Sequence, residues 1–119
     1  MNAEIVQEFR FQAGHFLPEL PVGHPCRRVH GHSYRVEVHV RGEIGDRSGW
    51  VQDFHALEAA VEPAIAELDH QLLNEIAGLP NPTAERIGVW LWERLAPRLP
   101  GLCQVVVWET ETARAIICG

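Results

Sequence analysis

Two long stretches of this chain alternate between apolar and polar side chains, and this pattern constrains the fold more than any other feature. In residues 4–15 the phenylalanines fall on one side and the glutamates on the other. In residues 32–43 the valines alternate in the same way with charged residues. A period of two residues is typical of strands that bury one face. We expect the two stretches to pair as an antiparallel hairpin joined by residues 16–29.

Two helices and two further strands are predicted downstream. The sequence indicates a helix over 54–70, a second helix opened by Asn81-Pro82-Thr83, and strands over 102–108 and 113–118. Asp53 is a favourable N-cap for the first helix, and Pro63 within it predicts a kink or a late start. The order strand, strand, helix, helix, strand, strand predicts an α+β fold with one sheet covered on one face by two helices. No linker divides the chain, so residues 1–119 are expected to form a single domain.

Composition narrows the class of function. The 119 residues carry a formal net charge of −6, which disfavours a nucleic-acid partner. No apolar run approaches the roughly 18 residues of a membrane helix, and the N-terminus lacks a signal-peptide pattern, so a cytoplasmic protein is expected. All 10 basic residues are arginine, which excludes Schiff-base lysine chemistry and a phosphate-loop lysine. The 7 histidines indicate metal binding or acid–base catalysis.

Three of these histidines should meet at one end of the predicted hairpin. His15 ends the first strand, while His30 and His32 begin the second and, being two residues apart, point to the same face. In an antiparallel pair, the end of one strand lies beside the start of the other. Three neutral imidazoles that leave a fourth position open are typical of catalytic zinc. We therefore predict that His15, His30 and His32 hold Zn²⁺.

Cys26 has two interpretations. It could complete a closed structural site as a fourth ligand beside the three histidines. Alternatively, the adjacent Arg27 and Arg28 favour its thiolate form, and a thiolate beside an open metal site can act as a base. We favour the base, but the spacing leaves both interpretations open.

Acidic residues mark two further candidate positions. Asp69 directly precedes His70 at the predicted end of the first helix, where a polar cap and an acid–base pair both fit. Glu109 follows a strongly apolar run, and a carboxylate in that setting needs a partner. It could bind a ligand edge that presents paired N–H donors. Glu111 lies on the same side of the predicted strand, and spacing does not choose between the two.

A set of short motifs covers nearly the whole chain. The set comprises His15, Cys26-Arg27-Arg28-Val29-His30-Gly31-His32, Asp69-His70, Asn81-Pro82-Thr83-Ala84-Glu85 and Glu109-Thr110. Together these motifs resemble the pyruvoyltetrahydropterin synthase superfamily. The three residues between the cysteine and the His-Gly-His look like the bacterial carboxytetrahydropterin synthase branch.

The resemblance implies a tunnelling fold, in which four antiparallel strands carry two helices. It also implies a homo-oligomer, in which trimers close their sheets into a barrel and two trimers stack head to head, with the active sites between subunits. The chain's 4 tryptophans fit such interfaces, since exposed aromatic surface usually marks a contact.

The resemblance further implies a zinc-dependent carbon–carbon lyase. Its substrate would be 7,8-dihydroneopterin triphosphate and its product 6-carboxy-5,6,7,8-tetrahydropterin, with release of acetaldehyde and triphosphate on the way to queuosine. Three alternatives remain open. These are a 6-pyruvoyltetrahydropterin synthase, an aldolase or epimerase acting on the dihydroneopterin side chain, and a non-enzymatic domain whose structural zinc binds Cys26.

The resemblance also assigns roles to residues of this sequence. Zinc would be held by the three histidines, Cys26 would move a side-chain proton, and Asp69 with His70 would form a second acid–base pair. Glu109 would anchor the N–H groups of the pterin ring, and Thr83 and Thr110 lie in motifs expected to contact substrate. That Arg27 and Arg28 meet the triphosphate is an electrostatic inference and not a family assignment.

Overall fold

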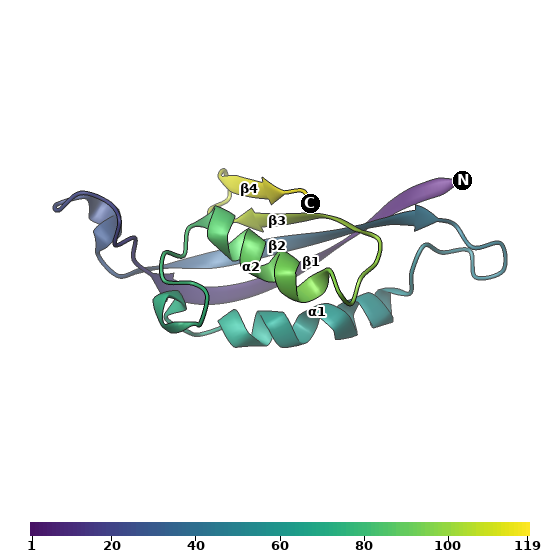
Figure 1. Cartoon of the computed structure of the whole chain (residues 1–119), viewed down its shortest axis with the longest axis horizontal. Coiled ribbons are helices and arrows are strands. Elements are labelled where there is room, and N and C mark those ends of the chain that lie inside the picture. The colour runs from purple at the N-terminus through teal and green to yellow at the C-terminus, as the bar shows by residue number, and fades with distance from the viewer.

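The computed structural model describes all residues from Met1 to Gly119 and contains one antiparallel sheet and two helices (Figure 1). The strands stand side by side in chain order as β1 (Asn2–His15), β2 (His30–Glu43), β3 (Leu102–Trp108) and β4 (Arg114–Ile117). The helices are α1 (Phe54–Leu68) and α2 (Ala84–Leu95), and single 3₁₀ turns occur at Pro25–Arg27 and Leu73–Glu75. The predicted α+β class and the ββααββ order are confirmed.

Strands β1 and β2 form a hairpin that pairs over its whole length. Asn2 lies opposite Glu43 at one end, and His15 lies opposite His30 at the other. Between these ends the buried side chains pack in cross-strand pairs, such as Phe11 on Tyr34 with ring centroids 4.7 Å apart. The register is fixed by burial, because a slip of one residue would turn the apolar side chains into solvent. This register brings the three histidines to the same end.

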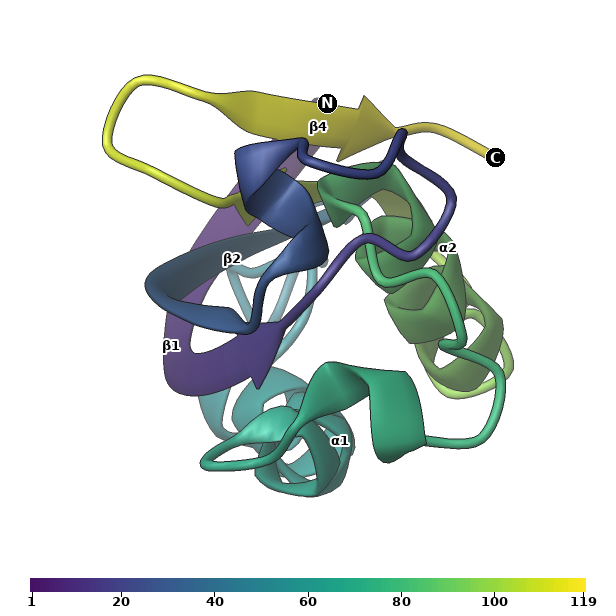
Figure 2. The same ribbon diagram turned by 90° about the vertical axis from the view of Figure 1, so that its left-hand side faces the viewer.

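Both helices cover the same face of the sheet and leave the other face open (Figure 2). Helix α1 begins where the carboxylate of Asp53 accepts a hydrogen bond from the His55 N–H, and α2 begins where the Thr83 hydroxyl accepts one from the Arg86 N–H. These caps satisfy N–H groups that have no partner within the helix. Helix α1 runs through Pro63, so the late start, one of the two alternatives predicted from this proline, is wrong, because the Asp53 cap sets the start.

The core lies between the sheet and the helices. It joins valines of β2 and β3 to leucines of α1 and α2. Trp90 belongs to this core, being 3% exposed and donating its indole N–H to the Ala77 carbonyl, whereas Trp50 is 52% exposed. Core packing thus accounts for Trp90, which the sequence had left as a possible contact between subunits. Neither helix combines the length and the apolar character needed to cross a membrane.

Candidate functional site

The three histidines predicted to converge do converge, at the end of the β1–β2 hairpin. His15 is the direct partner of His30, and His32 pairs with Ala13, one step along the same face. One ring nitrogen of each histidine lies within 4.8 Å of the corresponding nitrogens of the other two, a group that could hold a metal ion.

Backbone carbonyls orient two of these rings. His15 Nδ1 lies 2.8 Å from the carbonyl of Pro82, and His30 Nδ1 lies 2.7 Å from the carbonyl of Arg28. A carbonyl can only accept, so each Nδ1 carries the proton and each Nε2 keeps a free lone pair. His15 Nε2 is buried without a hydrogen-bond partner. An unpaired buried nitrogen among imidazoles fits a divalent cation, because a metal ion would satisfy it.

Burial favours the neutral form of His15 and His32, as metal ligation requires. Burial lowers the pKa of His15, and the neighbouring histidines lower it further, against opposing effects from Pro82 and Glu109. The pKa of His32 is lowered mainly by burial as well. Neutral rings present lone pairs without having to release a proton first.

The structure separates the two acidic candidates near the end of β3. Glu109 turns toward the histidines, with Oε1 3.7 Å from His15 Nε2 and 4.0 Å from His32 Nε2. Glu111 is exposed on the following turn and lines a different cavity, on the open face of the sheet. A second cavity, on the α2 side, is lined by both Glu85 and Glu109. Glu109 therefore reaches both the metal cluster and this cavity.

Cys26 lies in the 3₁₀ turn of the loop that joins β1 to β2 and is partly buried. Its backbone is fixed by hydrogen bonds to His24 Nδ1 and from the Leu17 N–H. The group that could hold a metal contains the three imidazoles and no sulfur. The guanidinium of the neighbouring Arg27 donates hydrogen bonds to the carbonyls of Pro18 and Leu20 in the same loop.

The Asp69–His70 pair lies at the edge of β1, directly after α1. Asp69 accepts the Gln12 N–H at 3.0 Å, and the Gln12 carbonyl accepts the His70 N–H at 2.6 Å. These bonds hold Asp69 and His70 against β1, so α1 ends at Leu68 and not at residue 70, where the sequence had predicted its end. His70 Nδ1 lies 3.0 Å from Asp69 Oδ2, and the His70 side chain is 77% exposed. Hydrogen bonds from Gln12 and His70 lower the pKa of Asp69.

The two threonines have local structural partners. Thr83 caps α2, and the Thr110 hydroxyl accepts the Thr112 N–H in the turn between β3 and β4. Sequence analysis assigned no role at the site to Pro82, whose carbonyl lies 2.8 Å from His15 Nδ1, or to Tyr34, whose hydroxyl lies 3.3 Å from the same nitrogen. Tyr34 could have been found from its position two residues after His32 on the same face. No sequence signal identifies the Pro82 carbonyl.

Comparison with known proteins agrees with this geometry. The sequence profile of the family described as 6-pyruvoyl tetrahydropterin synthase matches residues 4–119. The chain is 41% identical over 117 residues to a 6-carboxy-5,6,7,8-tetrahydropterin synthase of Synechocystis sp., covering 93% of this chain and 89% of that protein. It is 38% identical over 112 residues to a dihydroneopterin monophosphate aldolase of Pyrococcus furiosus, covering 92% and 91%.

A solved structure shows the same fold. The 6-pyruvoyl tetrahydropterin synthase of Caenorhabditis elegans superposes with a TM-score of 0.93 at 23% identity, covering 100% of this chain and 96% of that chain. Since the family profile extends over almost the entire sequence and both relatives align over most of its length, this chain belongs to the 6-pyruvoyl tetrahydropterin synthase family.

Proposed function

We propose that this protein is a zinc-dependent lyase that converts 7,8-dihydroneopterin triphosphate into 6-carboxy-5,6,7,8-tetrahydropterin, releasing acetaldehyde and triphosphate. The observation that carries the proposal is the buried, unpartnered His15 Nε2, which lies among imidazoles and 3.7 Å from the Glu109 carboxylate. A cation site next to a carboxylate suits a substrate that has hydroxyls at one end and ring N–H donors at the other. The 41% identity to the Synechocystis carboxytetrahydropterin synthase supports the choice of product.

Each polar group at the site has a role in this proposal. His15, His30 and His32 would hold zinc, which when bound would act as a Lewis acid toward the substrate hydroxyls. Glu109 would accept hydrogen bonds from the pterin N–H groups and fix the ring. Cys26, outside the metal cluster, would take a proton from the substrate side chain as a thiolate.

The proposal also includes an assembly, because Cys26 and His70, the two proposed acid–base groups, lie at different places in one chain. His70 is exposed at the edge of β1, and Cys26 lies in the loop at the end of the hairpin. The sheet has two edge strands, β1 and β4, whose outer backbone groups can pair with another copy, except at Gln12 and Gly14 of β1, which already bond to residues 69–71. We propose that copies join edge to edge into a trimeric barrel, that trimers stack in pairs, and that Asp69 and His70 of one copy serve a site in another.

A second candidate follows from the Pyrococcus furiosus relative, which is named a dihydroneopterin monophosphate aldolase. The same constellation could cleave the side chain of a monophosphorylated dihydroneopterin. The formation of a pyruvoyl product is a third possibility, because the family profile carries that name.

Product analysis separates these activities. Zinc-loaded protein would be incubated with 7,8-dihydroneopterin triphosphate and, separately, with the monophosphate, and the products identified by mass spectrometry. We expect carboxytetrahydropterin, acetaldehyde and triphosphate from the triphosphate substrate. Cleavage of the monophosphate alone would favour the aldolase, and intact substrate in both reactions would refute the lyase proposal.

A further inference from the structure

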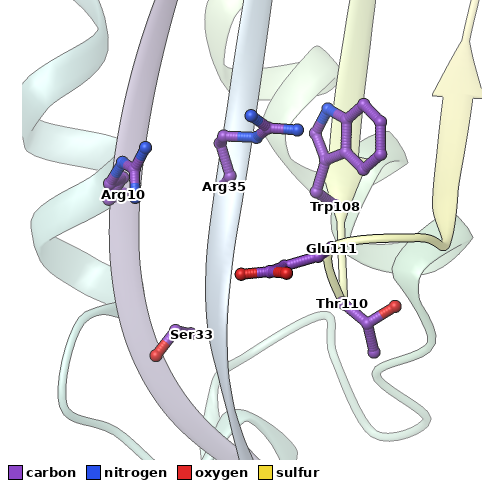
Figure 3. A pocket seen from close by; sticks show the side chains of 6 residues that line it. All are labelled: Arg10, Ser33, Arg35, Trp108, Thr110 and Glu111. Atoms are coloured by element: carbon purple, nitrogen blue, oxygen red, sulfur yellow. The ribbon is translucent and has the colours of Figure 1, made fainter.

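Three arginines share one row across the open face of the sheet. Arg10 of β1 is the direct partner of Arg35 of β2, Arg35 is the partner of Trp108 of β3, and Trp108 is the partner of Arg114 of β4. The row therefore spans all four strands. Figure 3 shows Arg10, Arg35 and Trp108 side by side on this face.

This concentration of positive charge needs an explanation. Like charges directly opposite each other on neighbouring strands destabilise a sheet, and the chain as a whole carries a net charge of −6. The carboxylate of Glu8 lies 3.5 Å from Arg35 but 3.9 Å from Arg10, so a single acidic group serves two guanidinium groups. The arginine pair is thus incompletely neutralised within the chain.

Two of the three guanidinium groups of the row, those of Arg35 and Arg114, stack on Trp108. The Arg35 guanidinium carbon lies 4.3 Å from the Trp108 ring centroid, and that of Arg114 lies 4.6 Å from it. The indole N–H donates to Glu37 at 2.6 Å, which fixes the ring itself. Stacked guanidinium groups keep their N–H donors free at the edge, and such donors match phosphate oxygens.

A cavity of about 330 Å³ lies beside this row (Figure 3). Its lining residues are Arg10, Ser33, Arg35, Trp108, Thr110 and Glu111. Two guanidinium groups and two hydroxyls are all hydrogen-bond donors for anionic oxygen. The one carboxylate in the lining belongs to Glu111, which is exposed on the turn and opposes an anion by its charge.

The cavity begins where β2 and β3 separate. Their pairing ends at Arg35 and Trp108, and Glu109 turns instead to bond the Ala113 carbonyl. Ser33 directly follows His32 of the metal cluster, and Thr110 directly follows Glu109. Because successive side chains of a strand point to opposite faces, the cavity opens on the face of the sheet opposite His32 and Glu109, and a bound substrate would reach it around the end of β3, where β2 and β3 separate.

We propose that this cavity binds an oligophosphate group, through Arg10 and Arg35 with Ser33 and Thr110. That the group is the triphosphate tail of the substrate rests on the proposed function. The site differs from the one expected at Arg27 and Arg28, since the Arg27 guanidinium is already bonded to carbonyls of its own loop.

Inorganic tripolyphosphate is the direct probe, measured by isothermal titration calorimetry on the zinc-loaded protein. Arg10→Gln and Arg35→Gln should each weaken its binding about tenfold or more, as expected for charge-assisted hydrogen bonds. Glu111→Gln should strengthen it by about fivefold, because a repelling charge is removed. Arg47→Gln, at an exposed position in the loop after β2, is the matched control and should leave binding unchanged.

Because Arg10 is largely exposed, Arg10→Gln and Glu111→Gln keep the test interpretable even if Arg35→Gln fails to fold. Binding that falls in Arg28→Gln but not in Arg10→Gln would overturn the proposal. Tripolyphosphate that fails to bind, or binds equally to all variants, would also overturn it.

Kinetics identify the source of the phosphate. If the tail of the substrate occupies the cavity, Arg10→Gln should raise KM for 7,8-dihydroneopterin triphosphate and leave the affinity for unphosphorylated 7,8-dihydroneopterin unchanged. If KM is unchanged while tripolyphosphate binding is lost, the site stands and its ligand is free oligophosphate. Because the calorimetry needs no turnover, a protein that binds tripolyphosphate but releases no acetaldehyde refutes the proposed function alone.

Discussion

His15 and Pro82 are 67 residues apart in the chain, yet the Pro82 carbonyl lies 2.8 Å from His15 Nδ1. The segment that begins α2 thus orients a ligand candidate at the end of β1. This contact leaves Nε2 of His15 as the atom that faces His30 and His32, and the hairpin register supplies the other two rings.

The metal site should depend on each of the three histidines. In His30→Ala, the zinc content measured by mass spectrometry should fall from about one ion per chain to a small fraction, because two imidazoles bind zinc weakly. Adding zinc should raise the Tm of the wild-type protein but not that of His30→Ala. His55→Ala, at the exposed start of α1, serves as control and should behave as wild type. Full zinc retention by His30→Ala would exclude this site.

Cys26→Ala distinguishes a base from a ligand. A base is dispensable for folding, so we expect retained zinc and an unchanged Tm, with kcat lower by about two orders of magnitude or more. Cys103→Ala is the matched control, because that thiol bonds Glu4 and the His39 carbonyl toward the other end of the hairpin. Loss of zinc in Cys26→Ala would instead support a structural four-ligand site.

Glu109→Gln should weaken the binding of the pterin ring. Charge-assisted hydrogen bonds of the kind proposed between Glu109 and the ring N–H groups are worth about 1.5–3 kcal/mol, so the affinity for unphosphorylated 7,8-dihydroneopterin should fall about tenfold or more. Glu111→Gln, two residues away and turned to the other face, should leave this affinity unchanged. Equal effects of the two substitutions would contradict the assignment of Glu109.

The proposed sharing of active sites between subunits predicts complementation. Cys26→Ala and His70→Ala should each be inactive alone, whereas mixed oligomers made by co-expression should regain activity, because some sites combine an intact Cys26 with an intact His70 from another copy. Co-expression of Cys26→Ala with His30→Ala is the control. Both of those residues come from the same chain, so no complete site can form. Equal activity in the two mixtures would rule out sharing.

The histidine at the centre of the open face should make stability depend on pH. His39 bonds Glu4 and Glu37, each at 2.9 Å. Burial opposes its protonation, but these two carboxylates outweigh burial and raise the pKa of His39 above 6.5. The hydrogen bond from His39 lowers the pKa of Glu4, and hydrogen bonds from Trp108 and His39 lower that of Glu37 despite burial.

The pH dependence of stability follows from the directions of these pKa shifts. A raised pKa of His39 stabilises the fold below 6.5, and this contribution is lost as pH rises through the folded value. The lowered pKa values of the glutamates stabilise the fold above 4.5, and this contribution is lost as pH falls. His39→Gln should therefore cost more free energy of unfolding at pH 5.5 than at pH 8.5, as measured by urea titration. A cost that grows with pH would contradict this account of the network.

Local pattern in the sequence determined the strands, the helices and the meeting of the three histidines. The period of two residues fixed which side chains face the core, and antiparallel pairing then placed His15 beside His30. Asp53 and Thr83 specified the helix starts through bonds that span only two or three residues. These features are predictable because each depends on neighbours in the chain or on a single strand pairing.

Only the tertiary structure decided the rest of the site. The face of the sheet to which the Glu109 side chain turns depends on where β2 and β3 separate. The end of α1 depends on the hydrogen bond from the Gln12 N–H to Asp69. The arginine row arises because four strands bring Arg10, Arg35 and Arg114 into one line, although they are far apart in the sequence. Such contacts join backbone and side-chain atoms across distant segments, and no periodicity or spacing within a single segment encodes them.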